Sequence, residues 1–79
     1  MATIQERIAK DLQIFAANVK KIDKEELSAD ERRIFALAEM YAKDCEAFAK
    51  KEDYYTSFSS IAYAHGLLDA ILKLHHKQE

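Results

Sequence analysis

Residues 54–72 read YYTSFSSIAYAHGLLDAIL and decide the fold of this 79-residue chain. They contain no Lys, Arg or Glu, and Asp69 is their only acidic residue. Their apolar residues recur at the three- and four-residue spacing of an α-helix. A helix this poor in charge needs cover on more than one side, so the segment predicts a largely buried helix over about residues 54–76.

Helical geometry, at about 100° per residue, divides this segment into two apolar faces. The first face, which we expect to meet the other helices, holds Phe58, Ile61, Ala62, His65, Leu68, Asp69 and Leu72. The second face lies nearly opposite and holds Tyr63, Leu67, Ala70, Ile71 and Leu74. A chain this small has too few other helices to cover both faces. We therefore predict that the second face is an interaction surface.

Capping residues mark where the helices begin. Thr3 is followed three residues later by Glu6, and Ser28 is followed in the same way by Glu31. In this capping box the hydroxyl accepts a hydrogen bond from the third helical N–H, and the Glu side chain accepts one from the N–H of the cap. Asp53 can cap a third helix.

Apolar periodicity extends the first two helices over about residues 4–22 and 29–51. The chain has no Pro and one Gly, so little else interrupts them. The linkers are short, which makes consecutive helices antiparallel. We predict an all-α, up-down-up three-helix bundle that forms a single domain over residues 1–79.

The second hairpin carries a distinctive pattern. Its first helix is rich in Tyr and contains Asp44 and Phe48, its turn ends in Asp-Tyr at 53–54, and its second helix contains YAHGLLDA at 63–70. This pattern resembles an archaeal family of uncharacterised small helical proteins, domain of unknown function number 357. The family tends to have Gly where this chain has Glu52. The resemblance implies a small helical protein with no assigned activity. The hairpin is also similar to one repeat unit of tetratricopeptide proteins.

Charge and composition exclude several classes of protein. Lys and Arg number 12 against 14 Asp and Glu, for a formal net charge of −2. Such a balanced charge does not predict the strongly basic surface that a nucleic-acid-binding protein normally has.

No signal peptide and no apolar run near 18 residues is present, so we expect a cytoplasmic protein with no membrane partner. The lone Cys45 excludes an intramolecular disulfide, and its place among apolar positions favours an inert thiol.

Four polar residues of the second hairpin are candidate ligand-binding residues. If its turn is centred at 52–53, Tyr41 lies opposite His65, Asp69 follows one helical turn later, and Asp44 lies at the edge. A carboxylate beside an imidazole shifts the pKa of both groups, as in acid–base sites. The same side chains also suit a structural hydrogen-bond cluster that fixes helix register.

No metal or cofactor site is predicted. His75 and His76 are adjacent and point about 100° apart, and the Glu-x-x-His spacing of di-iron bundles is absent. We therefore expect a non-enzymatic helical protein–protein interaction module that self-associates as a homodimer through the third helix. The alternative is a small-ligand-binding or catalytic bundle that uses the Tyr, His and Asp cluster.

Overall fold

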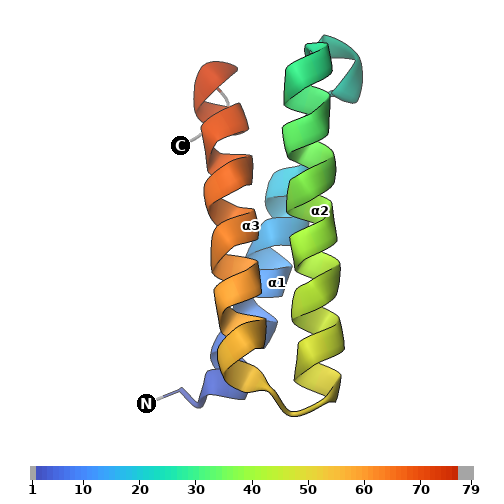
Figure 1. Ribbon diagram of the computed structural model, residues 1–79. Coiled ribbons are helices and arrows are strands. Elements are labelled where there is room, and N and C mark those ends of the chain that lie inside the picture. The colour runs from blue at the N-terminus through green and yellow to red at the C-terminus, as the bar shows by residue number, and fades with distance from the viewer. Residues whose placement is uncertain (1, 77–79) are drawn as a thin grey trace.

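The computed structural model describes residues 2–76, which form an all-α bundle with no strand in that range. Its elements are α1 (Ile4–Val19), the 3-10 helix η1 (Lys24–Glu26), α2 (Ala29–Lys50) and α3 (Tyr54–Leu74). Figure 1 shows α2 and α3 as a long antiparallel hairpin, with α1 lying behind it. The predicted all-α, three-helix fold is confirmed.

All three helices begin where the capping residues predict. The Glu6 N–H donates to the Thr3 hydroxyl at 3.1 Å, and the Glu6 carboxylate accepts from the Thr3 N–H at 3.1 Å. Ser28 and Glu31 form the same reciprocal pair at 2.8 and 3.1 Å. The Asp53 carboxylate accepts from an N–H in the first turn of α3 at 3.2 Å. Local side-chain chemistry therefore sets each helix start.

The end of α1 differs from the prediction, because the helix stops at Val19 instead of residue 22. The N–H groups of Lys21 and Ile22 donate to carbonyls three residues back, at 3.0 and 3.1 Å, which closes a tight turn. Asp23 then caps η1. The chain turns here because the connection folds inward, where Leu27 is buried and lies with Ile22 against the C-terminal end of α3.

The core lies around α3, which packs along α2 and also against α1, whereas α1 and α2 contact each other little. Ile71 belongs to this core and is 1% exposed. Its expected place on the exposed stripe is therefore wrong, because the α1–α2 connection covers this side of α3. The buried apolar residues are Ile8, Phe15, Leu27, Phe35, Ala38, Ala42, Cys45, Ile61, Ala64, Leu68, Ile71 and Leu72.

The seam between α2 and α3 is built from small side chains. The Ser57 hydroxyl donates to the main-chain carbonyl of Cys45 at 2.7 Å and lies 3.3 Å from the Cys45 Sγ. Ser57, Cys45 and Ala64 are fully buried. The side of α3 that meets Cys45 of α2 therefore carries a small serine, and His65, which the predicted turn set opposite Tyr41 of α2, lies against α1. Small residues on both helices allow this close packing.

The turn between α2 and α3 places a glutamate in a backbone conformation that favours glycine. Glu52 has a φ of 63°, in the left-handed region. Its N–H donates to the Ala49 carbonyl at 3.0 Å, and the Asp53 N–H donates to the Phe48 carbonyl at 3.0 Å. This is the Schellman arrangement, in which the left-handed residue is usually Gly. The turn therefore has this geometry with Glu52 in the position that usually holds Gly.

Replacing Glu52 by Gly is expected to stabilise the protein by about 1 kcal/mol, because a side chain disfavours the left-handed conformation. Urea denaturation followed by circular dichroism measures the free energy of unfolding. The matched control is Lys51→Gly next to it, where φ is −87° and glycine relieves no strain. The control should show no increase in the free energy of unfolding. A Glu52→Gly variant that is less stable than the unmodified protein would contradict backbone strain at Glu52.

Glu31 makes the stability of the fold depend on pH in the acid range. The hydrogen bond from the Ser28 N–H, with a further one from His75 at 2.9 Å, holds the pKa of Glu31 below its ordinary value. The unfolded chain then binds more protons than the folded chain in the acid range, so stability falls as pH drops from about 5 to about 3. Glu31→Gln keeps an accepting oxygen for the cap but cannot titrate. Between these two pH values, the melting temperature should fall less for the variant than for the unmodified protein. An equal fall in both proteins would refute the role of Glu31 in the pH dependence.

Candidate functional site

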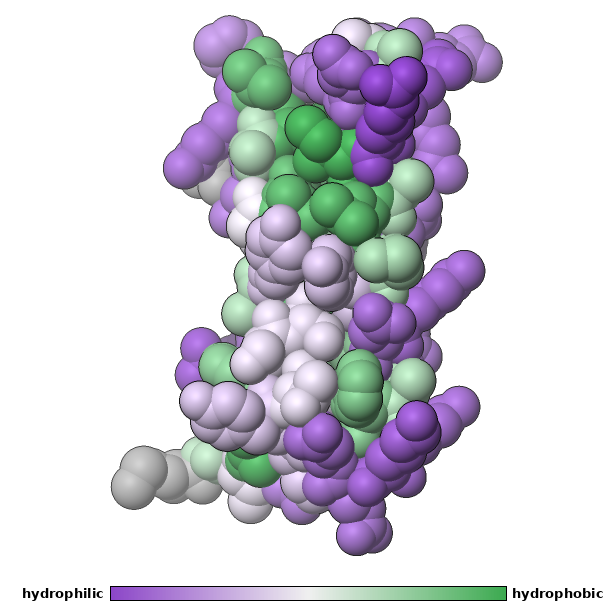
Figure 2. Space-filling model, viewed as in Figure 1, coloured by the Kyte–Doolittle hydropathy of each residue, from purple (hydrophilic) through white to green (hydrophobic). Residues whose placement is uncertain are grey.

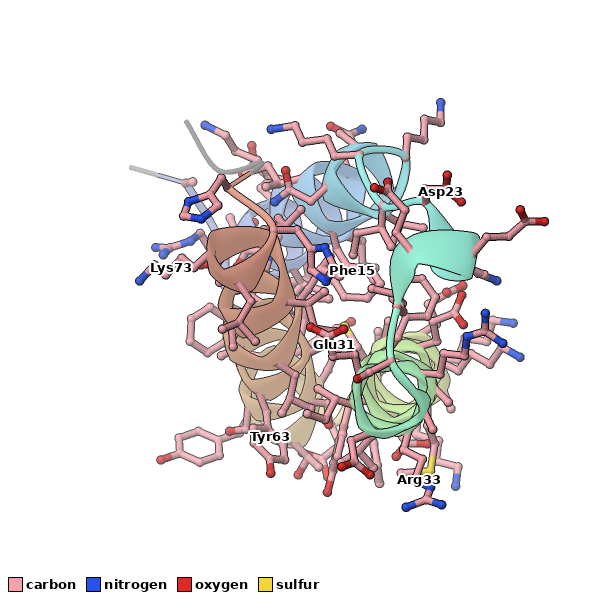
Figure 3. The ribbon with its side chains drawn as sticks, turned by 90° about the horizontal axis from the view of Figure 1, so that it is seen from above. Phe15, Asp23, Glu31, Arg33, Tyr63 and Lys73 are labelled. Atoms are coloured by element: carbon pink, nitrogen blue, oxygen red, sulfur yellow. The ribbon has the colours of Figure 1, made fainter. Side chains whose placement is uncertain are left out.

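The side of the α2/α3 hairpin that faces away from α1 is apolar at one end. Figure 2 shows this side toward the viewer, with hydrophobic side chains gathered in its upper half. In Figure 3, Tyr63 points to the side of α3 opposite α1. We call this surface the hairpin face, and it consists of Ile34, Leu37, Tyr41, Tyr63, Leu67, Ala70 and Leu74.

The hairpin face exposes large apolar side chains. Leu74 is 67% exposed and Tyr63 is 50% exposed. The ring of Tyr63 packs edge-on against the ring of Tyr41, with centroids 4.6 Å apart, and so joins the two helices. Along α3 the residues follow steps of four, three and four, and along α2 they follow steps of three and four. This is the spacing of residues that pack against another helix in a coiled coil.

Charged side chains border the hairpin face but do not enter its centre. Arg33 and Asp30 form an exposed ion pair at 3.2 Å on α2, and such pairs contribute little to stability. Lys73 lies on the outer side of α3, as Figure 3 shows. A partner can therefore cover the apolar centre without removing a charge from water.

The polar candidates do not form a joint hydrogen-bond cluster. His65 faces α1, where its Nε2 lies 3.0 Å from the Asp11 carbonyl oxygen and its ring meets Phe15 edge-on at 6.0 Å. Because a carbonyl oxygen only accepts, this nitrogen carries the hydrogen. Within residues 2–76, no hydrogen bond joins Tyr41, His65 and Asp69. The serine-lined seam is the reason, because it rotates His65 away from α2 and toward α1.

Two hollows among residues 2–76 lie away from these candidates. One partly open cavity of about 10 Å³ lies beside Ile71 and His75 and has room for about one water molecule. A second, open groove of about 580 Å³ lies between α1 and α2. Neither is lined by Tyr41, Asp44, His65 or Asp69. Asp44 and Asp69 are partly exposed, and their side chains form no hydrogen bond or ion pair with residues 2–76.

Cys45 is enclosed and chemically quiet. Burial raises the pKa of its thiol more than the hydrogen bond with Ser57 lowers it. Because the thiolate is the reactive form, this environment opposes nucleophilic chemistry. In the described range, every fully buried side-chain nitrogen or oxygen has a hydrogen-bond partner.

Residues 2–76 offer neither a metal site nor a membrane-spanning helix. Within them, no group of three or more His, Cys, Asp and Glu side chains is placed to hold a metal ion. His75 lies against Glu31 at 2.9 Å. None of the helices in this range is long and apolar enough to cross a membrane.

The contribution of α2 to the hairpin face is the part that sequence reasoning missed. Ile34, Leu37 and Tyr41 are partly exposed on α2, whereas the predicted interaction surface lies on the third helix alone. The signal that would have found them is the same three–four spacing on both helices of one antiparallel hairpin.

His65 is expected to matter more for stability than Asp69. His65→Ala removes a ring packed on Phe15 and leaves a backbone carbonyl without its second partner, which should cost about 1–3 kcal/mol. Asp69→Ala removes a partly exposed carboxylate that bonds to nothing in the described chain, and should cost less than about 0.5 kcal/mol. Urea denaturation of both variants compares the two losses, and a larger loss for Asp69→Ala would contradict the structure.

Comparison with known proteins gives a family but no activity. No curated protein shows significant sequence similarity to the chain. The sequence profile of a family described as Protein of unknown function (DUF357) matches residues 10–76. This match confirms the resemblance seen in the second hairpin and extends it into α1. The chain therefore belongs to the DUF357 family.

Proposed function

We propose that this protein is a non-enzymatic helical interaction module that associates with a second copy of itself through the hairpin face. The observation that carries the proposal is an apolar, coiled-coil-spaced surface on two helices that no third helix within residues 2–76 covers. Monomeric proteins seldom expose such contiguous apolar patches, which usually mark interaction sites. The Tyr63 and Leu74 side chains are the most exposed part.

The position of α1 supports this proposal. Through Phe15 and the Asp11 carbonyl, α1 meets the flank of α3 that carries His65. The hairpin face lies on the opposite side (Figure 3). Covering it by moving α1 would uncover Ile8 and Phe15, which are now 3% and 6% exposed. The chain has no spare helix in its described part, so another molecule is the natural cover.

The energetics are favourable but modest. Complete burial of a Leu side chain contributes about 1.5–3 kcal/mol, at about 25 cal/mol per Å². The hairpin face offers only a few large side chains, and most of them are already partly buried. Association also costs translational and rotational freedom. We therefore expect reversible association.

A ligand-binding or catalytic role for Tyr41, Asp44, His65 and Asp69 is the competing hypothesis. It needs these groups to converge on one cavity. His65 instead bonds to α1, Tyr41 packs on Tyr63, and the two carboxylates bond to no group within residues 2–76. No observation on these side chains favours the competing role over docking.

The double variant Leu67→Glu, Leu74→Glu should be a folded monomer, because buried carboxylates without partners oppose association. Sedimentation equilibrium should show a monomer–dimer equilibrium for the unmodified protein and monomers for the variant. Ile14→Glu is the control, because Ile14 is a similarly exposed apolar residue, 41%, on α1. It should associate like the unmodified protein. If the unmodified protein is a monomer at every accessible concentration, self-association is rejected.

A further inference from the structure

We propose that the two copies are related by a two-fold axis between Leu67 and Ala70, with their α3 helices antiparallel and only one end of each hairpin in contact. This inference rests on the proposed self-association and adds its geometry. It places Leu67 against the partner's Ala70, and Tyr63 against the partner's Leu74. The polar end of each hairpin then extends beyond the other molecule.

A difference in hydropathy between the two halves of the α2/α3 hairpin, on the side that faces away from α1, carries this inference. The upper half of this side is hydrophobic and its lower half is close to neutral in hydropathy (Figure 2). In the first half of α3, the exposed position Ser59 carries a hydroxyl side chain, which donates to the Tyr55 carbonyl at 3.0 Å. A contact that gains from apolar burial must therefore be centred on the second half, not on the middle of the helix.

The order of large and small residues favours a second copy as the partner. In a two-fold contact, residue i meets residue j of the other copy while j meets i. The stripe on α3 has large Tyr63 and Leu67, then small Ala70, then large Leu74. An axis midway along this stripe sets Leu67 against a small Ala70 on both sides, which lets the side chains interdigitate. An axis at Tyr63 would instead set Leu67 against Ser59.

Charge favours the antiparallel direction. A parallel pair would bring Lys73 close to the partner's Lys73 beside the stripe, and would align the two helix dipoles. In the antiparallel pair, Lys73 lies beside the partner's residues near 64, within the stretch that has no Lys, Arg or Glu. The uncharged centre of each face then meets the uncharged centre of the other.

The size of the contact predicts a weak dimer. The Cα envelope of the molecule measures 37 × 23 × 15 Å. A stable complex buries about 800 Å² on each partner, which is close to the whole of the largest face. Contact through one end buries less, so the complex belongs with the small, transient interfaces.

Disulfide trapping tests the position of the axis. The only native cysteine, Cys45, is 0% exposed. A single cysteine introduced on the surface is therefore the thiol that can form a disulfide between two copies. Ala70→Cys lies within one helical turn of its own copy across the proposed axis, within reach of a disulfide. Ser59→Cys, an equally exposed position on the same helix, lies several turns from its copy. Both variants are checked by circular dichroism and oxidised under mild conditions at the concentration where sedimentation shows dimer.

The expected result is disulfide-linked dimer forming at least about tenfold faster for Ala70→Cys than for Ser59→Cys. Adding Leu74→Glu to Ala70→Cys should abolish this advantage. Equal or faster linking at Ser59 would overturn the position of the axis while leaving self-association intact. A protein that sediments only as a monomer would overturn both. Small-angle scattering of the unmodified protein is an independent measurement: end overlap gives a dimer clearly longer than the monomer, and a dimer of unchanged length would overturn the geometry.

Discussion

The arrangement of the bundle depends on how closely α2 and α3 approach each other at Ser57. Its hydroxyl reaches the main-chain carbonyl of Cys45 at 2.7 Å, so no larger side chain separates the helices at this point. That carbonyl has a second lone pair for this bond in addition to its place in the helix. Ala38 on α2 and Ala64 on α3 are also small and fully buried. The seam therefore fixes the rotation of α3 about its own axis.

Several other features follow from this rotation. With serine and alanine toward α2, the ring of His65 turns to α1 and meets Phe15. Ile71 turns toward the α1–α2 connection and becomes part of the core. Tyr63 and Leu74 turn to the side that no helix covers. The exposed apolar surface and the absence of a shared polar cluster thus have one cause, which is the packing of small residues.

Within residues 2–76, the groove between α1 and α2 and the hairpin face differ in charge. The groove between α1 and α2 has Leu12 and Ala16 in its lining, but Lys20, Glu39, Lys43 and Glu46 also line it. A helix seated there must take charged groups partly out of water or pair them. The hairpin face has an uncharged centre and presents regularly spaced apolar side chains. This difference in charge supports the proposed docking at the hairpin face.

The sequence by itself determined the three helices, their starts, their antiparallel order and the family of the chain. These features are local: Thr3, Ser28 and Asp53 cap with neighbouring residues, and periodicity needs only the order of side chains along one helix. Only the tertiary structure decided which face of α3 is buried, where α1 ends, and that His65 meets α1. Periodicity ranks residues by hydrophobicity, so it placed one whole apolar stripe of α3 in the core and the other, including Ile71, on the surface. Ser57 and Ser60 rank low on that scale, yet their small volume lets them fill the narrow contact with α2.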